Sequence, residues 1–383
     1  MRRILGFIVL CLLLVGSAWA GGKITLLGAG ATFPYPLYHK WFDVYYKKTG
    51  IKVNYQAIGS GGGIRQLLAR TVDFGATDAP MTDEELARAP DKIIHIPTAL
   101  GAVAIGYNLP GVRSLKLDPE VLANLYLGKI KYWDDPAIKK INPEERLPHF
   151  PVMVAYRSDG SGTTYVFTDY LCKISDEWCQ KVGRGKAVRW PVGMGGKGNA
   201  GVAGLIKQIP GCIGYIEVAY AEKNHIPVAA LKNKAGKYVK PTLEAISAAA
   251  DIDIPDDTRC SITNTSAPDG YPISAFTWII LYQEQAYGKR PLKKAKALAE
   301  LLWWCIHEAQ EMNNKLLYGR LPETAVRKAE RLLLSVTYEG KPLLNKKVSE
   351  ISPQSEAEKA VEKQAEEKTT SSGKEQPKEK NEK

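Results

Sequence analysis

The sequence contains few histidines, and the five that it has are widely separated. They are His39, His95, His149, His225 and His307. None falls into a short metal-binding spacing, and the cysteine spacings do not resemble those of zinc sites either. We therefore expect no metal and no cofactor, which disfavours hydrolases that depend on paired metal ions.

A membrane-spanning run is also missing from the sequence. The apolar stretch over residues 4–15 is too short to cross a bilayer. It follows the basic start MRR and leads to AWA at residues 18–20, which is the pattern of a secretory signal peptide over residues 1–20. Cys11 directly follows Leu10, without small residues immediately before it, so no lipoprotein cleavage site is predicted. We expect an exported, soluble mature chain that starts near Gly21.

Cysteine is sparse, and its number is odd after export. One of the six cysteines, Cys11, leaves with the signal peptide. The remaining five are Cys172, Cys179, Cys212, Cys260 and Cys305. Cys172 and Cys179 flank a short polar turn and are our first candidate for a disulfide in an oxidising compartment. At least one thiol must stay free, and Cys305 lies in an apolar helical pattern where a buried, unpaired cysteine is ordinary.

The net charge is basic but not concentrated. It is +11 for the whole chain and falls by two, to +9, without Arg2 and Arg3. Lysines and arginines alternate with acids instead of forming a run. Together with export, this disfavours nucleic acid as a partner. An anionic small molecule or a charged partner surface stays possible.

Internal repeats are absent, and the composition changes only near the end of the chain. From residue 22 to about 352, short apolar runs alternate with amphipathic helical patterns, which predicts an α/β protein long enough for two lobes. Residues 353–383 hold one large aliphatic residue, Val361, among charged and polar ones. Such a segment buries too little surface to offset its ordering entropy, so we expect a disordered charged tail. A solvated appendage and a specific tether are both open readings of it.

The sequence does contain three strand-to-helix turns rich in Gly, Ser and Thr. The clearest is RSDGSGTT at residues 157–164, between a β-like run and a helical pattern. Such a turn offers free backbone N–H groups, hydroxyls and the positive end of a helix dipole, to which Arg157 adds a planar cation. An ordinary helix cap would use the same residue types. The turn is therefore either an anion site or a structural cap.

Two further turns make the anion site the better reading. They are GAGATFP at residues 28–34 and GSGGG at residues 59–63, each between a strand-like and a helix-like segment. Neither fits a dinucleotide fingerprint or a P-loop. Asp78 follows the predicted strand 72–76, at the carboxyl end where α/β sheets bind ligands. The Gly-rich stretch 193–201 is interpreted mainly as structural.

Long stretches of the chain resemble the periplasmic phosphate-binding protein of the ABC phosphate importer. The resemblance covers about residues 26–344 and rests on motifs that occur in the family's order. These are GAGATFPYPLYHKW at 28–41, VNYQAIGSGGGIRQL at 53–67, TVDFGATDAP at 71–80, LYLGKIKYWDD at 125–135, RSDGSGTTYVFTDYL at 157–171 and GMGGKGNAG at 193–201. The charged tail and the cysteines lie outside the family's pattern.

The resemblance implies a two-lobed α/β periplasmic-binding-protein fold of type II, with the ligand in the interlobe cleft. Lobe one would combine residues 22–105 and 275–350, and lobe two would span residues 106–274. The family captures inorganic phosphate in the periplasm and delivers it to the membrane subunits of an ABC permease. We accordingly expect a phosphate carrier that acts as a monomer and is not an enzyme.

The resemblance also implies the ligand contacts, residue by residue. The predicted phosphate-binding residues are Thr32, Phe33, Ser60, Asp78, Arg157, Ser161, Gly162 and Thr163, with Asp159 supporting the arginine. Phe33 would contribute its backbone N–H. The family often has a second serine where this chain has Gly61, so a hydroxyl contact is missing there.

Two alternatives to a phosphate carrier stay open. An exported phosphatase would need a nucleophile with a base, but the sequence around Ser161 is not a Gly-x-Ser-x-Gly elbow. A carrier for another tetrahedral oxyanion, such as sulfate, would share the fold. The carboxylate of Asp78 argues for a ligand that carries a proton.

Overall fold

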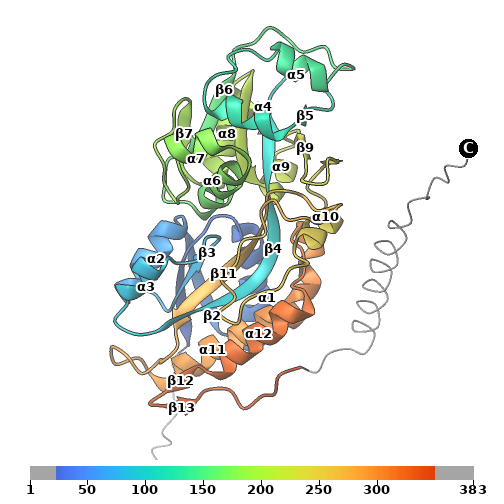
Figure 1. The fold of residues 1–383 in the computed structure, drawn as a ribbon. Helices are drawn as coiled ribbons and strands as arrows, with labels where there is room; N and C mark the ends of the chain where they lie inside the picture. Colours follow the sequence, from blue (N-terminus) through green and yellow to red (C-terminus); the bar gives the residue numbers. More distant parts are fainter. Residues whose placement is uncertain (1–22, 350–383) are drawn as a thin grey trace, which may run out of the picture.

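The computed structural model describes residues 23–349 and shows a mixed α/β chain folded into two lobes (Figure 1). The predicted signal peptide and the predicted charged tail lie outside the described residues. The main sheet has eight strands in the order β2-β1-β3-β11-β4-β8-β6-β7. The α/β class and the two-lobed fold expected from the sequence are confirmed.

The first lobe is built on the half of this sheet that contains the earliest strands. β1 (Thr25–Gly30) lies parallel to both β2 (Lys52–Ala57) and β3 (Phe74–Thr77). β11 (Ser274–Tyr282) returns from late in the chain and pairs antiparallel with β3 and with β4 (Ile93–Tyr107). Parallel neighbours bring the carboxyl ends of β1, β2 and β3 to one edge of the sheet.

The second lobe shares a strand with the first. Residues 93–102 of β4 pair with β11, whereas residues 103–107 pair with β8 (Cys212–Glu217). β8 continues in parallel to β6 (Met153–Arg157), and β6 to β7 (Met194–Gly196). The long strand β4 therefore runs through both lobes, as Figure 1 shows.

Helices cover both halves of the sheet. Those that matter for the site are α1 (Tyr35–Thr49), α2 (Ser60–Leu68), α6 (Gly162–Ile174), α8 (Gly198–Gln208) and α9 (Val218–Lys223). The others are α3 (Asp83–Ala87), α4 (Pro119–Tyr126), α5 (Pro136–Ile141), α7 (Asp176–Lys181), α10 (Leu243–Ala249), α11 (Leu292–Ile306) and α12 (Glu323–Leu334). The short elements within residues 23–349 are β5 (Lys116–Leu117), β9 (Ala230–Lys232), β10 (Tyr238–Val239), β12 (Thr337–Tyr338), β13 (Lys341–Pro342), and the 3-10 helices η1 (Glu308–Met312) and η2 (Asn314–Leu316).

Helix α1 shows why the sequence folds as it does next to the first turn. Its buried residues recur with the helical period: Leu37, Tyr38, Trp41, Phe42 and Tyr45. Proline within its first turn suits a helix start, because that N–H has no intrahelical partner. Gly50 ends the helix in the left-handed conformation, with φ of 72°. The helix is therefore fixed at its N-terminal end, directly after residues 28–34.

The segment after α10 contacts both lobes. The hydroxyl of Thr258 donates to the carbonyl of His95 in the first lobe at 2.7 Å. The hydroxyl of Ser261 donates to the carboxylate of Asp169 on α6 in the second lobe at 2.7 Å. The expected lobe boundaries, residues 22–105 with 275–350 and residues 106–274, therefore stay predictions.

The cysteine predictions hold in the described residues. Cys172 and Cys179 form a disulfide that joins α6 to α7. Cys212, Cys260 and Cys305 are free, and Cys305 is buried in α11.

Candidate anion-binding site

The three turns predicted from the sequence all connect a strand to a helix, and they converge. Residues 31–34 join β1 to α1, residues 58–59 join β2 to α2, and residues 158–161 join β6 to α6. Asp78 follows β3 directly. All eight residues predicted to bind phosphate are buried: Thr32, Phe33, Ser60, Asp78, Arg157, Ser161, Gly162 and Thr163. Their role as ligand contacts stays a prediction, which the geometry below bears on.

The two lobes touch where the turns meet. The Oγ of Ser60 accepts hydrogen bonds from the backbone N–H of Asp78, at 3.3 Å, and from that of Gly162 across the interface, at 3.1 Å. The N–H of Gly61 donates to the carbonyl of Gly160 at 2.9 Å. The structure therefore has the lobes closed on each other at the site.

Glycine at positions 59 and 61 permits this close contact. A Cβ on residue 61 would lie 3.3 Å from the Cα of Gly160. A Cβ on residue 59 would lie 2.7 Å from the carbonyl oxygen of Gly160, and Gly59 has φ of +86°. The glycine at position 61, where the family often has serine, thus lies in close backbone contact with the opposite lobe.

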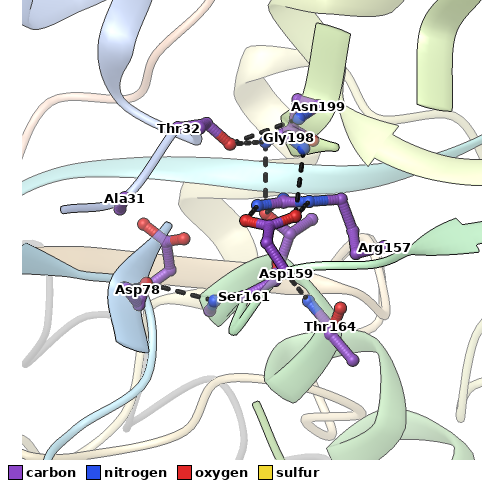
Figure 2. Close-up of polar contacts among 12 residues, drawn as sticks. Ala31, Thr32, Asp78, Arg157, Asp159, Ser161, Thr164, Gly198 and Asn199 are labelled. Atoms are coloured by element: carbon purple, nitrogen blue, oxygen red, sulfur yellow. Dashed lines mark hydrogen bonds and ion pairs between the residues drawn. The ribbon is translucent and has the colours of Figure 1, made fainter. Parts of the chain in front are cut away.

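Arg157 is held in a fixed orientation by Asp159. Its Nε and Nη2 donate to the two carboxylate oxygens at 2.7 and 2.6 Å, which is the bidentate arrangement that fits a guanidinium. The backbone N–H of Gly198 donates to Asp159 as well, at 3.0 Å (Figure 2). Burial favours the neutral carboxyl, but the hydrogen bonds and charge of Arg157 together with backbone N–H groups outweigh burial and lower the pKa of Asp159. The pair makes the contact that the predicted supporting role requires.

The hydroxyl groups of the predicted contacts all act as hydrogen-bond acceptors. Each hydroxyl oxygen accepts from an N–H group, and none of these hydroxyls donates its own proton within the described residues. Ser60 accepts from two backbone N–H groups, and Ser161 from that of Thr164 at 3.0 Å. Thr163 accepts from Arg157 Nη1 at 3.2 Å. Since a hydroxyl has one donor, these protons stay available for a ligand.

Asp78 provides the contrasting group, an acceptor. Its Oδ1 accepts from the hydroxyl of Thr277 on β11 at 2.9 Å. Its Oδ2 is buried and has no partner within residues 23–349. Burial raises the pKa of Asp78 to about 7, against the opposing effects of Thr277 and Arg157. A buried carboxylate oxygen without a partner, surrounded by hydrogen-bond donors, could accept a hydrogen bond from a ligand that carries a proton.

Comparison with known proteins identifies the family of this chain. The sequence model described as the PBP superfamily domain matches residues 15–306. A protein named phosphate-binding protein PstS from Pasteurella multocida (strain Pm70) is 43% identical over 311 residues, which is 80% of this chain and 89% of that protein. Another of that name from Methanocaldococcus jannaschii is 40% identical over 310 residues, which is 75% of this chain and 80% of that protein. The chain belongs to the phosphate-binding protein PstS family.

Solved structures support the family's fold for this chain. A high affinity periplasmic phosphate-binding protein (PfluDING) bound with phosphate superposes with a TM-score of 0.63 at 22% identity, over 81% of this chain and 93% of that one. A putative phosphate ABC transporter substrate-binding protein from Clostridium perfringens with bound phosphate gives a TM-score of 0.58 at 16% identity, over 78% of this chain and all of that one. At these identities the likeness establishes the fold alone.

For this member of the PstS family, a wide cleft lies beside the predicted contacts and does not enclose them. It measures about 810 Å³, and of the predicted residues only Thr32 and Asp159 line it. Its walls also carry Lys40, Lys197 and Lys223, which are exposed and form no ion pair within the described residues. The cleft therefore borders the predicted contacts at Thr32 and Asp159, and three lysines lie on its walls.

Sequence reasoning missed several residues of this PstS family site. Gly198 and Asn199 come from the Gly-rich stretch 193–201, interpreted above mainly as structural, yet they bond Asp159 and Thr32. Thr277, which bonds Asp78, lies in a strand-like run with no polar signal of its own. The hydroxyl of Tyr220 donates to the carbonyl of Thr32 at 2.7 Å. The strand-to-helix pattern at 193–201 matched that of the three turns and could have drawn attention to Asn199.

Two absences concern the described residues only. Within residues 23–349, no three His, Cys, Asp or Glu side chains are grouped to hold a metal. In the same part of the chain, no helix combines the length and apolarity needed to cross a membrane.

Proposed function

We propose that the chain binds inorganic phosphate between its lobes in the periplasm and delivers it to an ABC-type membrane permease. The names of its relatives support the ligand and the transport role. The observation that supports the proposal is that hydroxyl groups with unused protons lie where the turns meet, together with an acceptor, Asp78 Oδ2, that has no partner within residues 23–349. The proposal includes Thr32, Phe33, Ser60, Asp78, Arg157, Ser161, Gly162 and Thr163 as ligand contacts.

Phosphate fits this set because it carries both charge and a proton. Its relevant pKa is about 6 to 7, so near neutral pH it always keeps at least one P–OH group. Donors from both lobes bind its unprotonated oxygens, and ionised Asp78 accepts the P–OH proton. Sulfate has no such proton, so its oxygen would lie against a desolvated carboxylate, which costs about 1–3 kcal/mol or more.

This mechanism makes the selectivity depend on pH. Above pH 7 the empty site holds Asp78 ionised, and only a protonated anion satisfies it. Below pH 7 Asp78 itself carries a proton and can donate to sulfate. Discrimination against sulfate should therefore weaken as the pH falls through about 7.

The hydrogen bonds of the hydroxyl groups favour a carrier over an enzyme. No hydroxyl of the site donates to a histidine or carboxylate base within residues 23–349; each accepts from an N–H group instead. A nucleophile needs such a base. We therefore propose that the protein binds phosphate without cleaving esters and that it acts as a monomer.

Calorimetric titration of the mature protein, freed of ligand, tests the proposal. At pH 8 we expect one-to-one phosphate binding and no response to sulfate, with sulfate binding appearing at pH 5.5. Absence of phosphate binding at pH 8 would refute the proposed ligand. Hydrolysis of a chromogenic phosphate ester by the same preparation would refute the carrier and favour the enzyme.

A further inference from the structure

Asn199 lies between the two lobes and bonds a hydroxyl of each. It is the second residue of α8 and is completely buried. Its Nδ2 donates to the Oγ1 of Thr32 in the first lobe at 2.9 Å and to the Oγ1 of Thr163 in the second at 3.3 Å. Figure 2 shows the link from Thr32 to Asn199 beside the Arg157–Asp159 pair. One amide group thus connects two of the predicted ligand contacts.

The orientation of this amide is dictated by a third contact. Its Oδ1 accepts from the backbone N–H of Glu217 at 2.9 Å. A flipped amide would set an NH₂ group against that N–H, donor against donor. The oxygen must therefore face Glu217, and both N–H groups must face the threonines.

The fixed amide determines the direction of both hydroxyl protons. Thr32 Oγ1 also accepts from the backbone N–H of Asn199 at 3.3 Å, and Thr163 Oγ1 also accepts from Arg157 Nη1 at 3.2 Å. Each oxygen therefore receives two hydrogen bonds, which fills both of its lone pairs. What each hydroxyl has left is its proton, which must point away from Asn199.

We propose that Asn199 is a positioning residue that turns the hydroxyl protons of Thr32 and Thr163 toward phosphate. This inference rests on the proposed function and adds a residue to it. Asn199 itself does not need to touch the ligand. Because Thr32 and Asn199 belong to different lobes, the Nδ2–Oγ1 bond at 2.9 Å forms only when the lobes meet. Closure therefore orients the Thr32 donor.

The sharpest test is Asn199→Asp, which keeps the size and reverses the polarity. A carboxylate only accepts hydrogen bonds, so it can still accept from Glu217 N–H but must take the protons of Thr32 and Thr163 away from the ligand. We expect phosphate affinity to fall at least a hundredfold. Asn199→Ala frees the hydroxyls to rotate without capturing them, and we expect a loss of about tenfold. A structural role alone predicts the opposite order, because alanine leaves a cavity and aspartate does not.

Aspartate also adds a negative charge near an anion, and a second background separates the two effects. In a Thr32→Val, Thr163→Val background the charge is still added, but there are no hydroxyl protons to capture. We expect the loss caused by Asn199→Asp to shrink at least tenfold there. An equal loss in both backgrounds would reduce the effect to charge and overturn the proposal.

The experiment is phosphate titration of the full mature chain for each variant, with thermal unfolding to confirm the fold. If Asn199→Asp does not fold, Asn199→Ala is compared in the wild-type and the double-valine backgrounds instead. The loss of phosphate affinity caused by Asn199→Ala should disappear in the double-valine background. A loss that persists in that background would show that the role of Asn199 is only structural. Wild-type protein that does not bind phosphate overturns the proposed function and this inference with it. If wild-type protein binds phosphate but the Asn199 substitutions lower the affinity equally in both backgrounds, only this inference is overturned.

Discussion

The two sides of the site each present a carboxylate, buried in Asp78 and partly buried in Asp159, and the pKa values of the two are shifted in opposite directions. Asp159, in the second lobe, is paired with Arg157 and receives the Gly198 N–H, and its pKa is lowered. Asp78, in the first lobe, has one hydrogen bond and one oxygen without a partner in the described residues, and its pKa is raised. A carboxylate whose partners are all present holds the structure around it. A carboxylate with an oxygen that no described residue bonds keeps an acceptor that the proposed phosphate contact would use.

The largest effect on phosphate binding should follow from removing Arg157, the cation that pairs with Asp159. Arg157→Ala leaves Asp159 as a partly buried charge without its partner and removes a donor from the site. We expect phosphate binding to weaken by several kcal/mol, which is a thousandfold or more, in a calorimetric titration. Arg157→Lys is the matched control and should recover part of the loss, because it keeps the charge without the planar fork. Binding close to wild type in the alanine variant would remove Arg157 from the site.

Stability should distinguish the two carboxylates in ligand-free protein. The folded pKa of Asp78, about 7, lies above the unfolded value of about 3.9, so its contribution to stability is lost as the pH rises through that window. Asp78→Asn removes this loss. We expect the free energy of unfolding of the variant, measured in urea, to exceed that of wild type by about 4 kcal/mol at pH 8 and to show no gain below pH 4.

Asp159 should behave with the opposite sign. Its folded pKa is lowered, so it contributes stability above its unfolded pKa and loses it as the pH falls through the folded value. Asp159→Asn should therefore destabilise the protein at neutral pH and less so in acid. A stabilising effect of Asp159→Asn at neutral pH would contradict the comparison.

Substitutions of Asp78 and Asp159 should also differ in their effect on the preference for phosphate over sulfate. Asp78→Asn gives the site an amide that can donate to sulfate, so we expect the preference for phosphate over sulfate at pH 8 to fall about ten- to a hundredfold. Asp159→Asn should weaken both anions alike and leave their ratio unchanged. The measurement is a pair of titrations with each variant. An unchanged ratio in the Asp78 variant would refute its role in reading the ligand's proton.

The smallest effect should come from the three lysines on the walls of the cleft. Replacing Lys40, Lys197 and Lys223 by glutamine should slow phosphate association a few-fold at low ionic strength and have little effect in high salt, because the attraction is screened. Stopped-flow association rates would show this. The matched control replaces three exposed lysines outside the cleft, Lys140, Lys207 and Lys234. Equal slowing in both triple variants would show that only net charge matters.

Local patterns predicted the parts of the site that are local in the chain. The three turns, the place of Asp78 after β3 and the Cys172–Cys179 disulfide all follow from spacing over a few residues. Residues that complete the site through distant contacts could not be predicted in this way. Thr277 is 199 residues from Asp78, and Asn199 is 167 residues from Thr32. The sequence around each is consistent with a plain strand or helix start, so only the fold shows what each one meets.

The glycine contact between the lobes has a consequence for the distance between their donors. Gly61 and Gly160 meet backbone to backbone, with no side chain between them. Their contact limits how closely the two turns can approach each other. A Cβ on residue 61 would lie 3.3 Å from the Cα of Gly160, so a side chain there would require the turns to move apart by a few tenths of an ångström. The distance between the donors of the two lobes is therefore set in part by a contact between backbones.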